Sequence, residues 1–293
     1  MPTNFTPYIL ALGAGAFYAI SALLCKRGLE LGAGTIRSLV FSNWIMALFF
    51  IPYPFLGENL PEIYDVKSGI LLGCIFFISQ LACFFALEKG DASLVTPVMG
   101  AKSVFVAFFV VILDLTDKPP TGTWIATILT AIAVFLIGWP KRGGKPSYLA
   151  IFLGLTTAAG FGLTDAMVPG LSQKSEPLNV LFIMFATVGV NSFLLIPFIK
   201  GKLMNFSKPK DTWMLLSCIP MGIQAVLMSL SIGLHEVPAE ANVFYACRGI
   251  WAIILTAWIG KRIGLKERDS SNIVFSRRLI GATLLIISIY FTL

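Results

Sequence analysis

The sequence predicts an all-α membrane protein with ten transmembrane helices, arranged as two inverted repeats of five helices. Three observations lead to this fold class: the composition, the number of long apolar runs and a weak internal repeat. Of the 293 residues, 57% are hydrophobic and only 13% are charged, and the mean hydropathy is +0.84. Because so few charged groups cannot cover a soluble globule of this size, most of the surface must face lipid.

Ten apolar segments are long enough to cross a bilayer, which takes about 20 residues of helix. The runs 69–86 and 104–113 contain no charged residue at all, and connections such as 118–122 are short and rich in Pro and Gly. Pro97 and Pro169 lie within predicted spans, where a proline breaks or kinks a helix. The predicted spans cover residues 8–25, 35–56, 68–88, 91–113, 121–139, 148–171, 178–199, 212–234, 238–260 and 274–292.

Charge and cysteine content exclude several classes of function. The net charge of +7 resides largely in short loops between apolar segments, so membrane topology explains it and no nucleic-acid partner is expected. The five cysteines form no CxxC pair and have no neighbouring histidine, so we expect neither a disulfide framework nor a metal site. With one histidine and no catalytic motif, the chain is not expected to be an enzyme or to need a cofactor.

The distribution of Lys and Arg predicts the orientation in the membrane. On the side of the two termini, the loops contain only Lys67, Lys118 and Lys174, whereas the loops of the opposite side contain most of the 22 basic residues. Cytoplasmic loops are the basic ones, so both termini are predicted to be non-cytoplasmic. The first apolar run has neither a basic leader nor a clear cleavage site, and we interpret it as a retained span.

A weak internal repeat relates the two halves of the chain. A shift of 145–146 residues places Gly15 on Gly160, Pro52 on Pro197 and Lys102 on Arg248, and it places spans one to five on spans six to ten. The predicted repeats are residues 1–140 and 146–293. Because five is odd, the second copy enters the membrane from the opposite side, which is typical of secondary transporters.

The order of these elements resembles the drug/metabolite transporter superfamily, and specifically its ten-span EamA-type branch. The resemblance lies in segment 86–97 (Ala-Leu-Glu-Lys-Gly-Asp-Ala-Ser-Leu-Val-Thr-Pro), in the apolar fourth span and in the fifth span 123–138, with a similar layout in spans eight to ten. It implies a secondary carrier that moves small organic solutes by alternating access through a cavity lined by both halves. Where the family usually has a proline in the fourth and ninth spans, this chain has Lys102-Ser103 and Arg248-Gly249, so no substrate is implied.

Lys102 and Arg248 are the clearest candidates for a solute-binding role. Each lies near the middle of a predicted span, where a charged side chain costs about 2.5–3.5 kcal/mol to insert and is too far from either interface to reach it. Each should therefore face a cavity or a partner. A guanidinium fork and an ammonium together suit the anionic group of a solute, so the sequence favours an anionic or zwitterionic substrate, such as a carboxylate or an amino acid.

The alternative is that these cations are neutralised within the protein. Asp165 in the sixth span and Glu240 at the start of the ninth are the candidate partners, and either one is also a candidate for proton coupling. Glu240 precedes Arg248 by about 12 Å along a straight helix, so these two cannot touch within the ninth span. Both interpretations remain open from sequence, because a substrate or a proton can release an internal pair.

Further polar and aromatic side chains complete the predicted site. Asn43, Gln80 and Gln224 lie near mid-span and are candidate solute contacts, although hydrogen bonding between helices is the simpler role. Tyr245 and Trp251 lie three residues to either side of Arg248 and would share its face of a helix, as an aromatic wall or as packing.

The sequence thus predicts a secondary transporter in the plasma membrane, which in a bacterium is the inner membrane. Its expected partners are a small-molecule substrate and the lipid bilayer, with protons as a candidate coupling ion. The alternatives are an exporter of neutral or cationic drugs or metabolites and a flippase for a lipid carrier. A lipid-facing opening lined by apolar residues would distinguish the flippase from a carrier with a closed polar cavity.

Overall fold

A computed structural model of the chain describes residues 5–57, 59–89, 98–114, 116–138, 148–172, 174, 176–260, 262–264 and 272–293. All regular structure within these residues is helical. The helices are α1 (Thr6–Glu30), α2 (Thr35–Phe50), η1 (Tyr53–Phe55), α3 (Ile63–Lys89), α5 (Lys102–Leu113), α6 (Thr121–Gly138), α7 (Tyr148–Ser172), α8 (Pro177–Asn191), η2 (Ser192–Phe198), α9 (Lys210–His235), α10 (Pro238–Tyr245), α11 (Arg248–Leu255), η3 (Thr256–Gly260) and α12 (Asn272–Thr292).

Eight helical stretches among the described residues are long and apolar enough to cross a bilayer. They match the predicted spans one to three and five to nine, so the prediction of a multi-pass α-helical membrane protein is confirmed. In the predicted fourth span, α5 is a shorter apolar helix of 12 residues, and residues 90–97 fall outside the described part. Helix α12 occupies the predicted tenth span. The count of ten spans stays a prediction.

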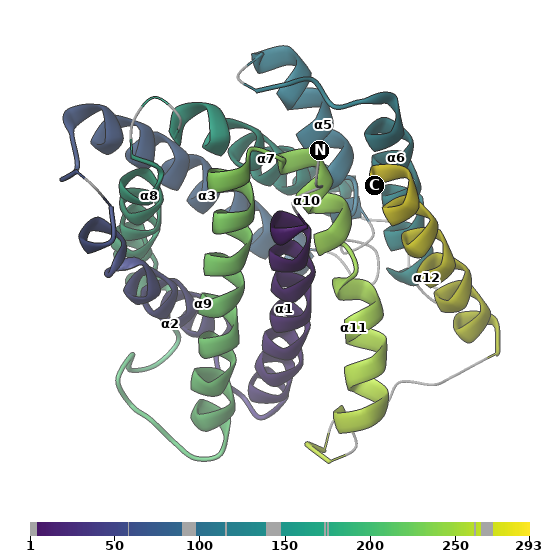
Figure 1. Ribbon diagram of the computed structural model, residues 1–293. Helices are drawn as coiled ribbons and strands as arrows, with labels where there is room; N and C mark the ends of the chain where they lie inside the picture. Colours follow the sequence, from purple (N-terminus) through teal and green to yellow (C-terminus); the bar gives the residue numbers. More distant parts are fainter. Residues whose placement is uncertain are drawn as a thin grey trace.

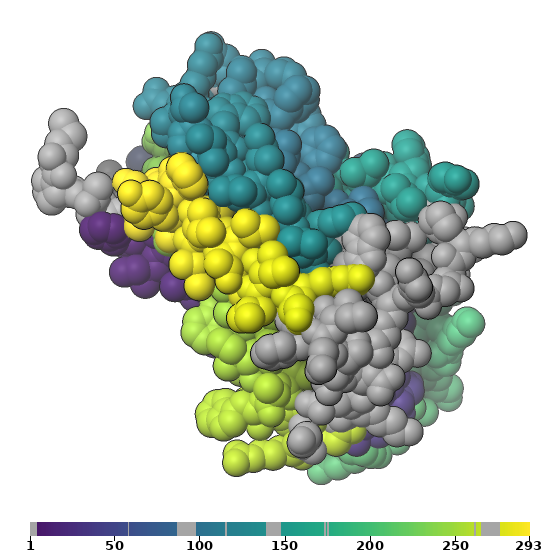
Figure 2. Space-filling view, turned by 90° about the vertical axis from the view of Figure 1, so that its right-hand side faces the viewer, coloured from purple at the N-terminus to yellow at the C-terminus, as the bar shows by residue number. Residues whose placement is uncertain are grey.

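The helices pack in a recurring set of pairs. Helix α9 packs against α1 and α2, and α3 packs against α7 and α8. Helix α2 also packs against α8. On the other side of the molecule, α12 lies along α6 (Figures 1 and 2). Helix α1 begins and α12 ends at the same end of the bundle (Figure 1).

Glycines allow the closest helix contacts. A Cβ atom on Gly73 of α3 would lie 2.6 Å from the Met184 carbonyl oxygen of α8, and one on Gly15 of α1 would lie 3.0 Å from the Tyr245 carbonyl oxygen of α10. In lipid, helices associate through such close backbone approach, because the lipid is as apolar as the side chains. Gly15 thereby brings α1 directly against the junction of α10 and α11.

The predicted ninth span is not one continuous helix. Helix α10 ends at Tyr245, a turn follows at Ala246 and Cys247, and α11 begins at Arg248. Through the turn, backbone N–H groups bond carbonyls three residues back, as from Cys247 to Phe244. The predicted span 238–260 is present, but the turn within it was not predicted, because no proline or helix-terminal motif marks it. Pro169, where a break or kink was expected, lies inside α7, which continues to Ser172.

Candidate functional site

Both intramembrane cations are the first residues of helices. Lys102 begins α5 after a turn at Gly100 and Ala101, and Arg248 begins α11 after its own turn. The first N–H groups of a helix lack partners within it and carry a partial positive charge. Non-helical backbone at membrane depth occurs only where protein or a water-filled cavity surrounds it. The turns therefore place two cations inside the protein, and carbonyls of the turns accept from the N–H groups of Val104, Phe105, Gly249, Ile250 and Trp251.

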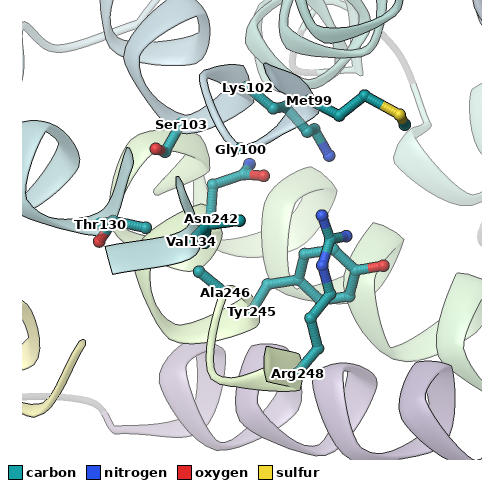
Figure 3. Close-up of a pocket in the computed structure, with 10 residues that line it drawn as sticks. All are labelled: Met99, Gly100, Lys102, Ser103, Thr130, Val134, Asn242, Tyr245, Ala246 and Arg248. Carbon is teal, nitrogen blue, oxygen red and sulfur yellow. The ribbon is translucent and has the colours of Figure 1, made fainter. Parts of the chain in front are cut away.

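The two cations line the same pocket (Figure 3). Lys102 reaches into it from one side and Arg248 from the other, with Tyr245 beside the guanidinium (Figure 3). The pocket has room for about one water molecule. An organic solute can therefore enter only after the surrounding helices move apart. The lining residues are Met99, Gly100, Lys102, Ser103, Thr130, Val134, Asn242, Tyr245, Ala246 and Arg248.

Lys102 has a carboxylate partner. Its Nζ lies 2.6 Å from Oδ2 of Asp165 on α7, and both side chains are largely buried. Asn242 of α10 donates a hydrogen bond from Nδ2 to the same oxygen at 2.8 Å. The ammonium also lies 5.9 Å from the ring centroid of Phe161 and 5.5 Å from that of Tyr245. The internal pairing proposed from sequence is therefore present for Lys102.

Arg248 has aromatic neighbours instead of a carboxylate. Its guanidinium carbon lies 4.9 Å from the ring centroid of Tyr18 on α1 and 4.6 Å from that of Tyr245, and the two rings meet edge to face. Among the residues that the structure describes, no carboxylate oxygen lies within 4.0 Å of this guanidinium. Aromatic faces attract a cation but carry no charge that would neutralise it. Within the described part of the chain, Arg248 thus has no counter-charge beside the pocket.

Comparison with known proteins identifies the first half of the chain. Residues 5–139 match the model of the EamA-like transporter family. Over these residues the chain is similar to EamA-like transporters. The resemblance inferred from sequence is therefore confirmed, and the coarse function that follows is that of a membrane transporter of small molecules.

A solved structure resembles nearly the whole chain in fold. It is described only as "Crystal structure of protein", and it aligns with 98% of this chain and 96% of its own at a TM-score of 0.73 and 12% identity. At that identity the likeness shows the fold alone. No curated protein matches the sequence.

The structure places the remaining predicted site residues outside the pocket. Glu240 accepts a hydrogen bond from Oγ1 of Thr123 at 2.9 Å, and within the described residues it forms no ion pair. Asn43 and Gln80 bond each other through both amides, at 3.0 and 3.1 Å. Such a pair holds helices together. Gln224 on α9 and Trp251 on α11 are partly buried but do not line the pocket.

Two neighbours of the cations were not predicted from sequence. Tyr18 lies three residues after Gly15 on α1, and Phe161 lies four residues before Asp165 on α7. Residues with these spacings share a helix face, so each aromatic was recognisable once its neighbour was known to face the pocket. The sequence offered no sign of which face that would be.

Proposed function

We propose that this protein is a secondary carrier of a small organic anion or zwitterion, working by alternating access across the plasma membrane. The observation that carries the proposal is the pair of cations in one pocket, of which only Lys102 has a carboxylate partner among the residues that the structure describes. A buried charge is normally paired, because leaving it unpaired costs several kcal/mol. An unpaired guanidinium at membrane depth is therefore suited to receive the charge from a solute.

The type of cation supports a carboxylate or a similar planar anion. A guanidinium presents parallel N–H donors that match the two oxygens of a carboxylate, and such charge-assisted bonds are among the stronger hydrogen bonds in proteins. Tyr18 and Tyr245 lie against Arg248 and would restrict its orientation. A held guanidinium loses less freedom on binding than a mobile one.

The helix pairs support the proposed inverted repeats. If the halves are equivalent, α1 corresponds to α7, α3 to α9, and α5 to α10 with α11. The packing of α1 on α9 then mirrors that of α3 on α7, and the packing of α1 on α10 and α11 mirrors that of α5 on α7. The family match ends at residue 139, next to the proposed boundary between repeats 1–140 and 146–293. This arrangement supports ten spans in two inverted repeats, and the distribution of Lys and Arg supports non-cytoplasmic termini.

The size of the pocket supports a cycle in which the site opens. A metabolite is larger than the space of about one water molecule, so binding requires the residues that line the pocket to move apart. The turns before Lys102 and Arg248 are places where half-helices can reorient. Opening toward one side and then toward the other would carry the solute across.

A ligand panel on the purified protein tests the proposal. Thermal melting is measured with carboxylates, amino acids, sugar phosphates, lipid-linked phosphates and cationic drugs, since a bound ligand raises the melting temperature. Organic anions or amino acids should stabilise the wild type, and proteoliposomes should take up the same compounds. Stabilisation by cationic drugs alone would overturn the substrate class, and stabilisation by lipid-linked phosphates alone would identify a flippase.

A further inference from the structure

The charges of the side chains at the pocket do not sum to zero. Lys102 and Arg248 contribute two positive charges, and Asp165, bonded to Lys102, contributes one negative charge. Among the described residues, the other carboxylates with partners lie elsewhere, as Asp211 pairs with Arg37 and Glu240 accepts from Thr123. The described part of the site therefore holds one unbalanced positive charge, located on Arg248.

We infer that Asp165 sets the charge of the transported solute and that the wild-type site selects monovalent organic anions. This inference rests on the proposed function, because it assigns the solute class to the same pocket. In a buried site a charge imbalance is far more costly than in water. A monoanion balances the pocket, whereas a dianion leaves one excess negative charge and a neutral solute leaves Arg248 without a counter-charge.

The bonding of Asp165 argues against a zwitterion. A bound zwitterion needs a carboxylate acceptor for its ammonium group as well as a cation for its carboxylate. The Oδ2 atom of Asp165 already accepts from Nζ of Lys102 at 2.6 Å and from Nδ2 of Asn242 at 2.8 Å. An added ammonium would have to share this carboxylate with Lys102, and a zwitterion, having no net charge, would leave the excess positive charge of the pocket unbalanced. The monoanion balances that charge, so it is favoured over the zwitterion.

Substitutions of near-equal size change the balance one charge at a time. Lys102→Gln removes one positive charge and leaves a balance of zero. Asp165→Asn removes the negative charge and leaves two positive charges. The double variant, Lys102→Gln with Asp165→Asn, returns to one positive charge on Arg248. If charge balance selects the solute, the preference between monoanion and dianion should depend on the net charge of each variant and not on which side chains it carries.

Binding is measured with glutarate and its monomethyl ester, which differ by one charge at neutral pH, and with further mono- and dicarboxylate pairs of other lengths. The wild type should prefer the monoanion of a pair by about tenfold or more. Lys102→Gln should weaken monoanion binding by a similar factor, and the added Asp165→Asn should restore it to within about threefold. Asp165→Asn alone should reverse the preference toward the dianion.

Asp211→Asn is the matched control, because Asp211 is also a carboxylate in a buried ion pair but does not line the pocket. Its preference between the two anions should equal that of the wild type. If Asp165→Asn does not fold, the comparison of Lys102→Gln with the double variant still tests the inference. If anions bind but the preference between monoanion and dianion does not change with the charge of the variant, the role of Asp165 is overturned. If no anion binds the wild type or any variant, the proposed function itself fails.

Discussion

The surroundings of Lys102 and Arg248 differ although the two residues have similar positions in their own helices. Each is the first residue of a helix that follows a turn, and each lines the same pocket. Lys102 has a carboxylate at 2.6 Å, whereas Arg248 lies between the rings of Tyr18 and Tyr245. The comparison teaches that, within the described residues, a carboxylate compensates Lys102 but not Arg248, and this difference is the basis of the proposed anion site.

The difference originates in the helices that face the two cations. Helix α7 presents Asp165 to Lys102, and the repeat shift of 145–146 residues places Asp165 on Ala19 or Ile20 of α1. The first half therefore has no carboxylate at the corresponding positions. Tyr18 fills the space beside Arg248 instead. The fold of the two halves can be similar while their electrostatics are not.

The largest expected effect is that of removing the uncompensated cation. Arg248→Gln should lower uptake of the stabilising anion into proteoliposomes by about a hundredfold or more, since the loss of one partner of a buried charge pair costs about 2–5 kcal/mol. Arg248→Lys should retain part of the uptake, because it keeps the charge but not the fork. Lys118→Gln removes a positive charge from an exposed side chain and should leave uptake unchanged. Wild-type uptake by Arg248→Gln would show that the compensated and uncompensated cations do not differ in function.

The next effect concerns the contribution of the Lys102–Asp165 pair to the stability of the fold. Asp165→Asn should lower the free energy of unfolding by about 3 kcal/mol, because it leaves Lys102 buried without its counter-ion. Adding Lys102→Gln to this variant should recover a large part of the loss. The measurement is a double-mutant cycle by denaturant or thermal unfolding in one detergent. Additive losses would mean that the two side chains do not stabilise each other.

A smaller effect is expected where α1 meets the turn before Arg248. A Cβ atom on Gly15 would lie 3.0 Å from the Tyr245 carbonyl oxygen and 3.2 Å from the Arg248 backbone nitrogen, so Gly15→Ala should cost about 1–2 kcal/mol of stability and lower uptake. Gly13→Ala is the control, since its Cβ would meet only a Leu227 side chain at 3.5 Å. Thermal melting and uptake are compared for both variants. Equal behaviour of the two would mean that α1 does not position the Arg248 end of the site.

The smallest effect is expected at Tyr18, where two substitutions separate the role of the aromatic ring beside Arg248 from that of the hydroxyl group. Tyr18→Leu should weaken anion binding a few-fold, corresponding to the loss of about 0.5–1 kcal/mol of attraction between ring and cation. Tyr18→Phe keeps the ring and should bind like the wild type. Binding is followed by thermal shift against anion concentration. A Tyr18→Phe variant as weak as Tyr18→Leu would assign the effect to the hydroxyl group.

The sequence by itself determined the fold class and the family. Apolar runs of about 20 residues can be stable only as helices in lipid, because every backbone polar group must be bonded within the segment. The same reasoning identified Lys102 and Arg248, since charged residues at mid-span are rare and costly. These conclusions depend on local composition, and local composition is what a sequence displays directly.

Only the tertiary structure decided which cation is compensated. Asp165 lies 63 residues from Lys102 in the sequence and Tyr18 lies 230 residues from Arg248, and neither spacing indicates a contact. Sequence reasoning offered Asp165 and Glu240 as candidate partners of the cations, and the structure placed Asp165 on Lys102 and Glu240 on Thr123. The turn before Arg248 was also not predicted, because no proline or helix-terminal motif marks it. Charge pairing between distant helices depends on which faces meet, and that is a property of the packed bundle alone.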